Sequence, residues 1–199
     1  MSSSSSWTEH TDRRAWAEQP EHVVLLPGLT DTRYRDKTTN CHTKQYLLDV
    51  LGPQIGASRQ HNFPLSLVLA EMAHLRQIRF TYGSSMVDKI LEETATLLRA
   101  NIRSTDLLIR YANEIYGLLL LHANRHGTEL VCRRLRSAIS KHIFCGKGSD
   151  TILTVNFGAA EQTGLYDLEG KELLTEASKA LAAANQIGHS AIVIAGINL

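Results

Sequence analysis

Apolar residues recur along this chain at two spacings, and segments of the two kinds alternate from residue 43 to residue 195. Spacing of about three or four positions predicts helices over residues 43–61, 84–102, 128–143 and 172–185. Short apolar runs predict strands over residues 65–71, 107–111, 115–121, 152–157 and 191–195. A tight turn at Ala112-Asn113-Glu114 joins the second and third strands into a hairpin. Strands mixed with helices around a hairpin predict an α/β sandwich with a mixed sheet.

Three of these segments have features that refine the prediction. The strand at 65–71 is apolar on both faces, which is typical of a central strand. Pro53 lies inside the helix predicted over 43–61 and is expected to bend it. In the helix over 128–143, we predict a buried stripe formed by Val131, Leu135, Ala138 and His142.

The N-terminal residues differ in composition from the rest of the chain. A serine run follows Met1, and residues 7–22 are polar with charges of both signs. Such a segment buries too little surface to offset the entropy lost on ordering, so we interpret residues 1–30 as a flexible tail and 31–199 as the folded domain. Because Trp7, Trp16 and the apolar patch 23–26 lie in this tail, docking onto a partner or onto the domain remains an alternative.

Composition and charge narrow the classes of function. The chain is 43% hydrophobic and 21% charged, which is ordinary for a globular domain, and its net charge of +1 gives no support for nucleic-acid binding. The three cysteines, Cys41, Cys132 and Cys145, show no Cys-x-x-Cys spacing, so we expect reduced thiols and a cytoplasmic location. The sequence contains no run of 18 apolar residues, so we expect no direct insertion into a membrane.

Six short blocks, in order and at family spacing, resemble the GGDEF (diguanylate cyclase) domain over about residues 36–197. The resemblance implies a nucleotidyl-cyclase-like sandwich, in which helices flank a central mixed five-stranded sheet. The blocks are Asp36 to Lys44, Glu71 to Arg76, Thr81-Tyr82-Gly83, Ala112 to Tyr116, Thr154 to Gly158, and Ala177 to Leu181 with Asn185 and Gly188.

The family's catalytic residues are largely replaced in this sequence. Ala112 and Asn113 stand where the resemblance implies two glycines that approach the nucleotide closely. Ile115 replaces a carboxylate, while Glu71 and Glu114 keep two implied metal-ligand positions. The other departures and remnants are Asn185 and His189 at cation positions, Asp88 at a guanine-reading carboxylate position, and Arg79 in place of its companion asparagine. We therefore expect no cyclase activity, no bound Mg²⁺ and no cofactor.

The residues that the resemblance assigns to a product-binding inhibitory site are present. Arg103 and Asp106 form an Arg-x-x-Asp pair between a predicted helix and a predicted strand, where side chains can turn outward, and Arg134 stands at the position of a second arginine on the following helix. In relatives this pair binds the guanines of cyclic di-GMP, which is bound as a dimer of two stacked molecules. An arginine fork matches the O6 and N7 acceptors of guanine, and a carboxylate accepts from its N1 and N2 hydrogens.

These observations predict a catalytically inactive GGDEF protein that binds cyclic di-GMP and passes the signal to a protein partner. Since two stacked ligand molecules expose faces on both sides, ligand-bridged homodimers are a further expectation. Arg-x-x-Asp is common, so Arg103 and Asp106 could instead be a surface ion pair. Two alternatives remain: a ligand-independent docking module, and a weak cyclase or GTP-binding regulator that uses Glu71, Glu114 and Asp88.

Overall fold

The computed structural model describes residues 31–145, 153–163, 169–188 and 190–196. The prediction of a flexible tail over residues 1–30, with its two tryptophans, lies outside the described residues. His189 lies outside them as well.

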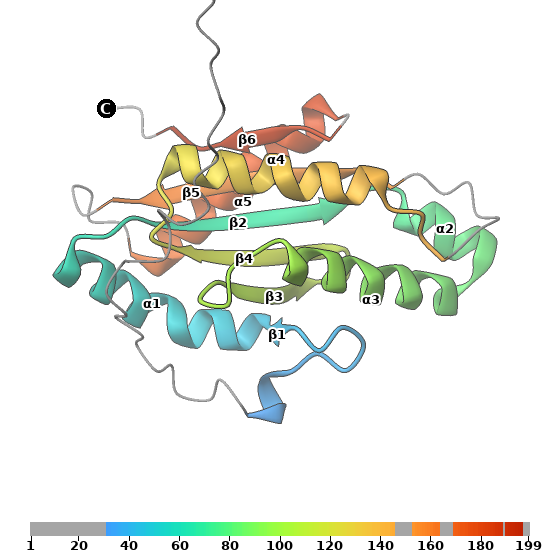
Figure 1. Ribbon diagram of the computed structural model, residues 1–199, viewed down its shortest axis with the longest axis horizontal. Helices are drawn as coiled ribbons and strands as arrows, with labels where there is room; N and C mark the ends of the chain where they lie inside the picture. Colours follow the sequence, from blue (N-terminus) through green and yellow to red (C-terminus); the bar gives the residue numbers. More distant parts are fainter. Residues whose placement is uncertain (1–30, 146–152, 164–168, 189, 197–199) are drawn as a thin grey trace, which may run out of the picture.

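One mixed sheet forms the centre of the molecule (Figure 1). Its strands lie in the order β1-β3-β4-β2-β5-β6; the β1–β3 and β5–β6 pairs are parallel and the other pairs antiparallel. The strands are β1 (His42–Thr43), β2 (Leu65–Met72), β3 (Leu107–Ala112), β4 (Ile115–Leu121), β5 (Val155–Gln162) and β6 (Ile192–Ile194). The α/β sandwich with a mixed sheet is confirmed, but the sheet has six strands and not five. The additional strand, β1, is two residues long and too short to show an alternating pattern.

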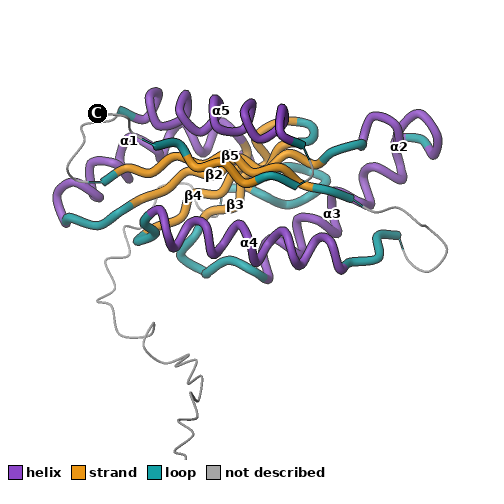
Figure 2. The backbone as a smooth tube through the Cα atoms, turned by 90° about the horizontal axis from the view of Figure 1, so that it is seen from above, coloured by secondary structure: helices purple, strands orange, loops and turns teal. Residues whose placement is uncertain are grey.

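Helices cover both faces of the sheet (Figure 2). One core packs α1 and α5 against the sheet, and the other packs α3 and α4 against the opposite face. The helices are α1 (Lys44–His61), α2 (Leu75–Tyr82), α3 (Ser84–Ala100), α4 (Arg125–Lys141) and α5 (Gly170–Ile187), preceded by a 3-10 helix at Thr32–Tyr34. Pro53 lies inside a continuous α1, which ends where Asn62 adopts a left-handed conformation.

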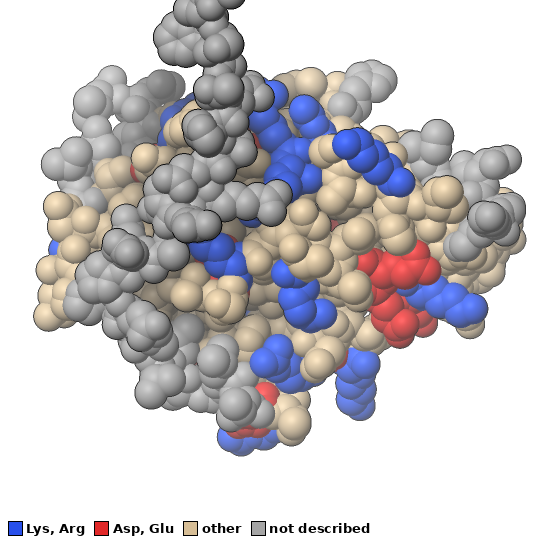
Figure 3. All heavy atoms as spheres, in the orientation of Figure 1, with Lys and Arg blue, Asp and Glu red and all other residues tan. Residues whose placement is uncertain are grey.

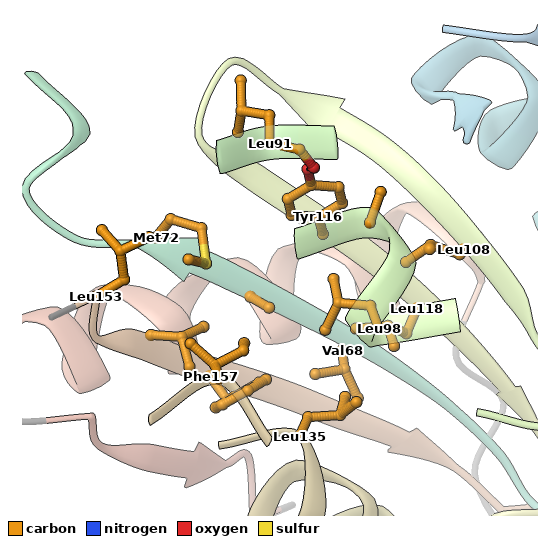
Figure 4. Packing of buried hydrophobic residues seen from close by; sticks show 14 of the residues in the cluster. Val68, Met72, Leu91, Leu98, Leu108, Tyr116, Leu118, Leu135, Leu153 and Phe157 are labelled. Carbon is orange, nitrogen blue, oxygen red and sulfur yellow. The ribbon is translucent and has the colours of Figure 1, made fainter. Parts of the chain in front are cut away.

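The central position predicted for the strand at 65–71 is confirmed. In β2, Leu67 and Leu69 pack in the core with α1 and α5, while Val68 and Met72 pack in the core with α3 and α4. Figure 4 shows Val68, Met72 and Phe157 among the side chains of this second core. Because both faces are covered, nearly every residue of β2 is buried.

Two further elements, α2 and β5, differ from the predictions. Helix α2 was not predicted, because only Leu75 and Ile78 of its residues are buried. Strand β5 begins at Val155 and continues through Gly158-Ala159-Ala160, small residues that favour no strand by themselves. At Gly158 the small size is required by close packing, since a Cβ added there would lie 2.0 Å from the backbone nitrogen of Leu181 in α5.

The predicted stripe on α4 is partly wrong. The helix begins at Arg125, where the side chain of Asn124 accepts a hydrogen bond from the Gly127 N–H. Its buried residues are Thr128, Cys132, Leu135 and Ile139, so of the predicted stripe only Leu135 is fully buried. The apolar pattern alone did not reveal that Thr128 and Cys132 face the core.

Candidate functional site

The Arg103–Asp106 turn joins α3 to β3, and its carboxylate is held by backbone amides. One oxygen of Asp106 accepts a hydrogen bond from the Arg103 N–H at 3.0 Å, and the other accepts one from the Leu121 N–H at 3.2 Å. Burial raises the pKa of Asp106, opposed by these hydrogen bonds and by the positive charges of Arg103 and Arg134. Arg103 is exposed as expected, but Asp106 is half-buried and does not simply turn outward, because it also closes this turn.

Arg134 extends from α4 to the same turn. Its Nε and Nη2 donate to the backbone carbonyl of Asn101, at 3.0 and 2.6 Å. Asn101 is the residue that ends α3, so Arg134 binds α4 to the C-terminal end of α3. The fold thus brings Arg103, Asp106 and Arg134 to one corner. Since a guanidinium has five N–H donors, three on Arg134 are available to a ligand, and each oxygen of Asp106 has a further lone pair.

The hairpin between β3 and β4 lies against the end of β2. The carbonyl of Glu114 accepts a hydrogen bond from the Met72 N–H at 2.9 Å. In the ladder between β2 and β4, Ile115 is directly opposite Glu71. Directly opposite residues of an antiparallel pair point to the same face of the sheet. The side chains of Glu71 and Ile115 therefore lie beside each other on one face of the sheet.

Glu71 already has an internal partner. The side-chain amide of Asn185 in α5 donates to the Glu71 carboxylate at 2.6 Å, and the oxygen of that amide accepts from Asn156 at 3.0 Å. The oxygen of Asn156 in turn accepts from the Ala191 N–H at 3.0 Å, just before β6. A chain of hydrogen bonds therefore connects Glu71 to the edge strand. In the described part of the chain, no three His, Cys, Asp or Glu side chains gather in a group that could hold a metal ion.

A cavity of about 340 Å³ lies beside the hairpin. Asp88, Ala112 and Asn113, three of the predicted active-site remnants, line it together with Arg79, which replaces the companion asparagine. Its remaining lining residues are Asp36, Thr38, Leu91 and Arg110. Glu71, Glu114 and Ile115 do not line it.

Arg110 was not singled out from the sequence, although it lies only two positions before Ala112. Its Nη2 donates to the Asn113 carbonyl, and its guanidinium carbon lies 4.9 Å from the centre of the Tyr116 ring. Its Nη1 is buried and has no hydrogen-bond partner among the described residues. Tyr116 is fixed below it by a 2.6 Å hydrogen bond from its hydroxyl to the Leu91 carbonyl. Arg110 thus brings a positive charge to the wall of the cavity.

The sheet order and the hairpin between β3 and β4 define a mixed α/β sandwich of the kind expected for a GGDEF domain. The model of the family described as "Diguanylate cyclase, GGDEF domain" matches residues 33–191, so the chain belongs to the GGDEF family.

Among curated proteins, the chain is similar to diguanylate cyclase DosC of Escherichia coli strain K12, with 26% identity over 158 residues. That match covers 79% of this chain and 34% of DosC. Diguanylate cyclase A of Treponema denticola is 25% identical over 168 residues, covering 82% of this chain and 45% of that protein. The chain therefore spans between a third and a half of these relatives.

Solved structures support the fold. The GGDEF domain of FimX from Pseudomonas aeruginosa superposes with a TM-score of 0.75 at 19% identity, covering 80% of this chain and 98% of that one. The GGDEF domain of DgcB from Caulobacter crescentus, solved in complex with c-di-GMP, gives a TM-score of 0.75 at 16% identity, covering 81% of this chain and 93% of that one.

In the described residues, no helix is long and apolar enough to span a membrane.

Proposed function

We propose that this protein binds cyclic di-GMP at Arg103, Asp106 and Arg134, makes none itself, and passes the signal to a protein partner. The observation that carries the proposal is the meeting of an arginine from the α3–β3 turn, a carboxylate from that turn and an arginine from α4 at one corner. Two guanidinium groups and one carboxylate are the chemistry that recognises a guanine edge.

The existing hydrogen bonds of this corner affect how a ligand binds. Arg134 already binds the Asn101 carbonyl, and Asp106 already accepts two backbone N–H groups. A ligand that uses the remaining donors and lone pairs keeps these bonds, whereas one that pulls Arg134 away exposes the end of α3. We infer that the first mode is favoured, because it keeps the hydrogen bonds from Arg134 to the Asn101 carbonyl at the end of α3.

The proposal that the protein is inactive rests on the surroundings of Glu71, at the end of β2 beside the hairpin. The curated relatives are named diguanylate cyclases, so turnover has to be measured directly. Ile115 opposite Glu71 removes one carboxylate, and Asn185 occupies the other by a hydrogen bond. Because bound metal and fixed charge supply most of the transition-state stabilisation in phosphoryl transfer, we expect no cyclic di-GMP after overnight incubation with GTP and Mg²⁺ or Mn²⁺. A product peak abolished by Glu114→Ala would contradict this expectation.

Calorimetry with cyclic di-GMP tests the binding site. Arg103→Ala should weaken binding by about ten- to a hundredfold, since one bidentate guanine contact is worth about 1–3 kcal/mol. Arg134→Ala should also weaken it, but by less if a second protomer supplies an arginine. Lys141→Ala is the matched control, because it removes a positive charge from the same helix. Equal affinity of the wild type and Arg103→Ala would refute the assignment.

Asp106→Ala needs a second measurement, because this carboxylate also closes the turn. The change should lower the melting temperature, since two backbone N–H groups lose their acceptor. Asp106→Asn keeps one acceptor oxygen but replaces the other with a donor. It should therefore stay folded and still lose affinity.

Sedimentation with and without ligand tests the expected ligand-bridged dimer.

Binding of a guanine nucleotide in the 340 Å³ cavity is the second candidate function. The positive charges of Arg79 and Arg110 in the lining favour an anionic ligand there, and Asp88 keeps the carboxylate that reads guanine in the family. A non-hydrolysable GTP analogue should then bind the wild type and bind Asp88→Ala more weakly, with cyclic di-GMP affinity unchanged. If neither ligand binds at tens of micromolar, the docking-module alternative replaces both.

A further inference from the structure

Among the residues that the structure describes, strand β6 forms an open edge of the sheet. Within that part of the chain it pairs only with β5, in parallel, and the flanking Ala191 carbonyl and Ala195 N–H bond to Phe157 and Ala159 of that strand. Because backbone groups of successive strand residues point to opposite sides, those of Ile192 and Ile194 point away from β5. Within the described part of the chain, no other strand pairs with this side of β6. An open edge of this kind can pair with another extended chain.

A groove runs beside this edge, between β6 and α4. It has a volume of about 290 Å³ and is lined by the side chains of Ile192 and Ile194 and by one side of α4. The α4 residues are Arg125, Glu129, Arg133 and Arg136. Figure 3 shows basic side chains gathered over α4 next to β6.

Two of the arginines hold the ends of the edge strand. Arg125 donates to the Ala195 carbonyl at 3.0 Å, and Arg136 donates to the Ser190 carbonyl at 3.1 Å. Arg125 and Arg136 are eleven positions apart, or about 16 Å along a helix. Ser190 and Ala195 are five positions apart, or about 16 Å along a strand. Helix α4 therefore runs antiparallel to β6 and places positive charge along its whole length.

The groove carries an excess of positive charge. Its lining has three arginines and one carboxylate, Glu129, which accepts a hydrogen bond from Arg133 at 2.6 Å. This local excess is larger than the net charge of the whole chain, which is +1. Each guanidinium keeps further N–H donors after the bonds described. The groove thus favours an anionic occupant over a neutral or cationic one.

We propose that this groove and the edge of β6 receive an extended acidic segment of a partner protein, which adds to the sheet as a further strand. The backbone of the segment would bond to the outward groups of Ile192 and Ile194. Its alternate side chains would point toward α4. Arg125 and Arg133 lie eight positions apart, about 12 Å along the helix, so acidic residues four positions apart in a strand, about 13 Å, would reach both.

This surface differs from the corner proposed for cyclic di-GMP. Arg134 belongs to the same helix but binds Asn101 at the end of α3, on the side of α4 away from β6. The two proposals can therefore fail independently. The edge of β6 is tested in the absence of cyclic di-GMP.

The probe is a fluorescein-labelled peptide in which glutamate and valine alternate over seven residues. Its binding to the full chain is followed by fluorescence anisotropy. We expect a Kd below about 100 µM at low ionic strength, and weakening as salt is added. The same peptide with lysine in place of glutamate should not bind. Two further versions carry N-methyl groups, one on every valine and the other on every glutamate. At least one of them should lose binding, because one of the two sets of N–H groups must face β6.

Two variants of the protein locate the site. Arg133→Glu should weaken binding about tenfold, which corresponds to about 1.4 kcal/mol. Ile194→Pro removes an outward N–H and blocks the edge, so it should abolish binding, while proline remains tolerated on an edge strand. Lys179→Ala is the matched control, because Lys179 is an exposed cation of α5 paired with Glu176 of its own helix at 2.8 Å.

The proposal is overturned if the glutamate and lysine peptides bind equally, or if both N-methylated peptides bind as well as the unmodified one. It is also overturned if Arg133→Glu has no larger effect than Lys179→Ala. Melting curves check that each variant is folded. If Ile194→Pro does not fold, the N-methylated peptides and Arg133→Glu still decide the question.

Discussion

Acidification should destabilise this domain through His42 in β1. The imidazole is 5% exposed and stacks on the Tyr46 ring, with 4.2 Å between centroids. Burial, and then the positive charges of Arg35 and Arg99, lower its pKa from 6.5 to about 4. Its Nδ1 is buried without a hydrogen-bond partner among the described residues. Protonation in the folded state is therefore costly.

The sign follows from comparing the folded and unfolded chains. Between about pH 4 and pH 6.5 the unfolded chain binds more protons at this residue than the folded one. Stability is therefore lost as the pH falls from 6.5 toward 4. The difference between the two pKa values corresponds to about 3 kcal/mol, and allowing for screening by solvent we expect a loss of about 2 kcal/mol.

Urea unfolding of the wild type and His42→Phe at about pH 7, 6, 5 and 4 measures this loss. Phenylalanine keeps a ring on Tyr46 and cannot be protonated, so the variant should lose about 2 kcal/mol less than the wild type over this range. Other histidines and carboxylates titrate in both proteins and cancel in the comparison. A difference between the two proteins that stays constant from pH 7 to pH 4 would refute the reasoning.

Three further predictions concern the core. Gly158→Ala should lower the free energy of unfolding by about 3 kcal/mol or more in urea unfolding, because its Cβ would overlap the backbone of Leu181. Tyr116→Phe should lower it by about 1 kcal/mol, because the Leu91 carbonyl loses a buried hydrogen bond; a smaller change would mean that the carbonyl finds another donor. Burial raises the pKa of Cys132 to about 12, so iodoacetamide at about pH 8 should label this thiol, detected by mass spectrometry, only after unfolding.

The sequence predicted most of the sheet because its strands are long apolar runs. The hairpin of β3 and β4 was expected within a residue of where it lies, since Asn113 and Glu114 interrupt two such runs. Helix α2 was missed, because its apolar residues do not all lie on the buried face. Phe80 is 94% exposed, so the spacing of apolar residues does not show which face of this helix packs against the core. The extent of β5 depended on contact with α5, which local pattern does not encode.

The candidate sites were predicted only in part, for a related reason. The family resemblance indicated Arg103, Asp106 and Arg134, but not that Asp106 accepts the Leu121 N–H from the end of β4. Residues far apart in the chain make that contact, and residue spacing carries no information about it. Arg110 was overlooked because an arginine inside a strand has no distinctive pattern. Only the packing of Tyr116 beneath it and the neighbouring cavity make it notable.

The central position of β2 has a consequence for how this chain is synthesised. Its two neighbours in the sheet, β4 and β5, both follow it in the sequence. Val155, where β5 begins, is 155 − 72 = 83 residues after Met72. At about 5–20 residues per second, the ribosome makes β5 about 4 to 17 s after β2. During that interval an apolar strand is exposed with at least one unpaired edge, so nascent chains should need protection from aggregation until β5 emerges.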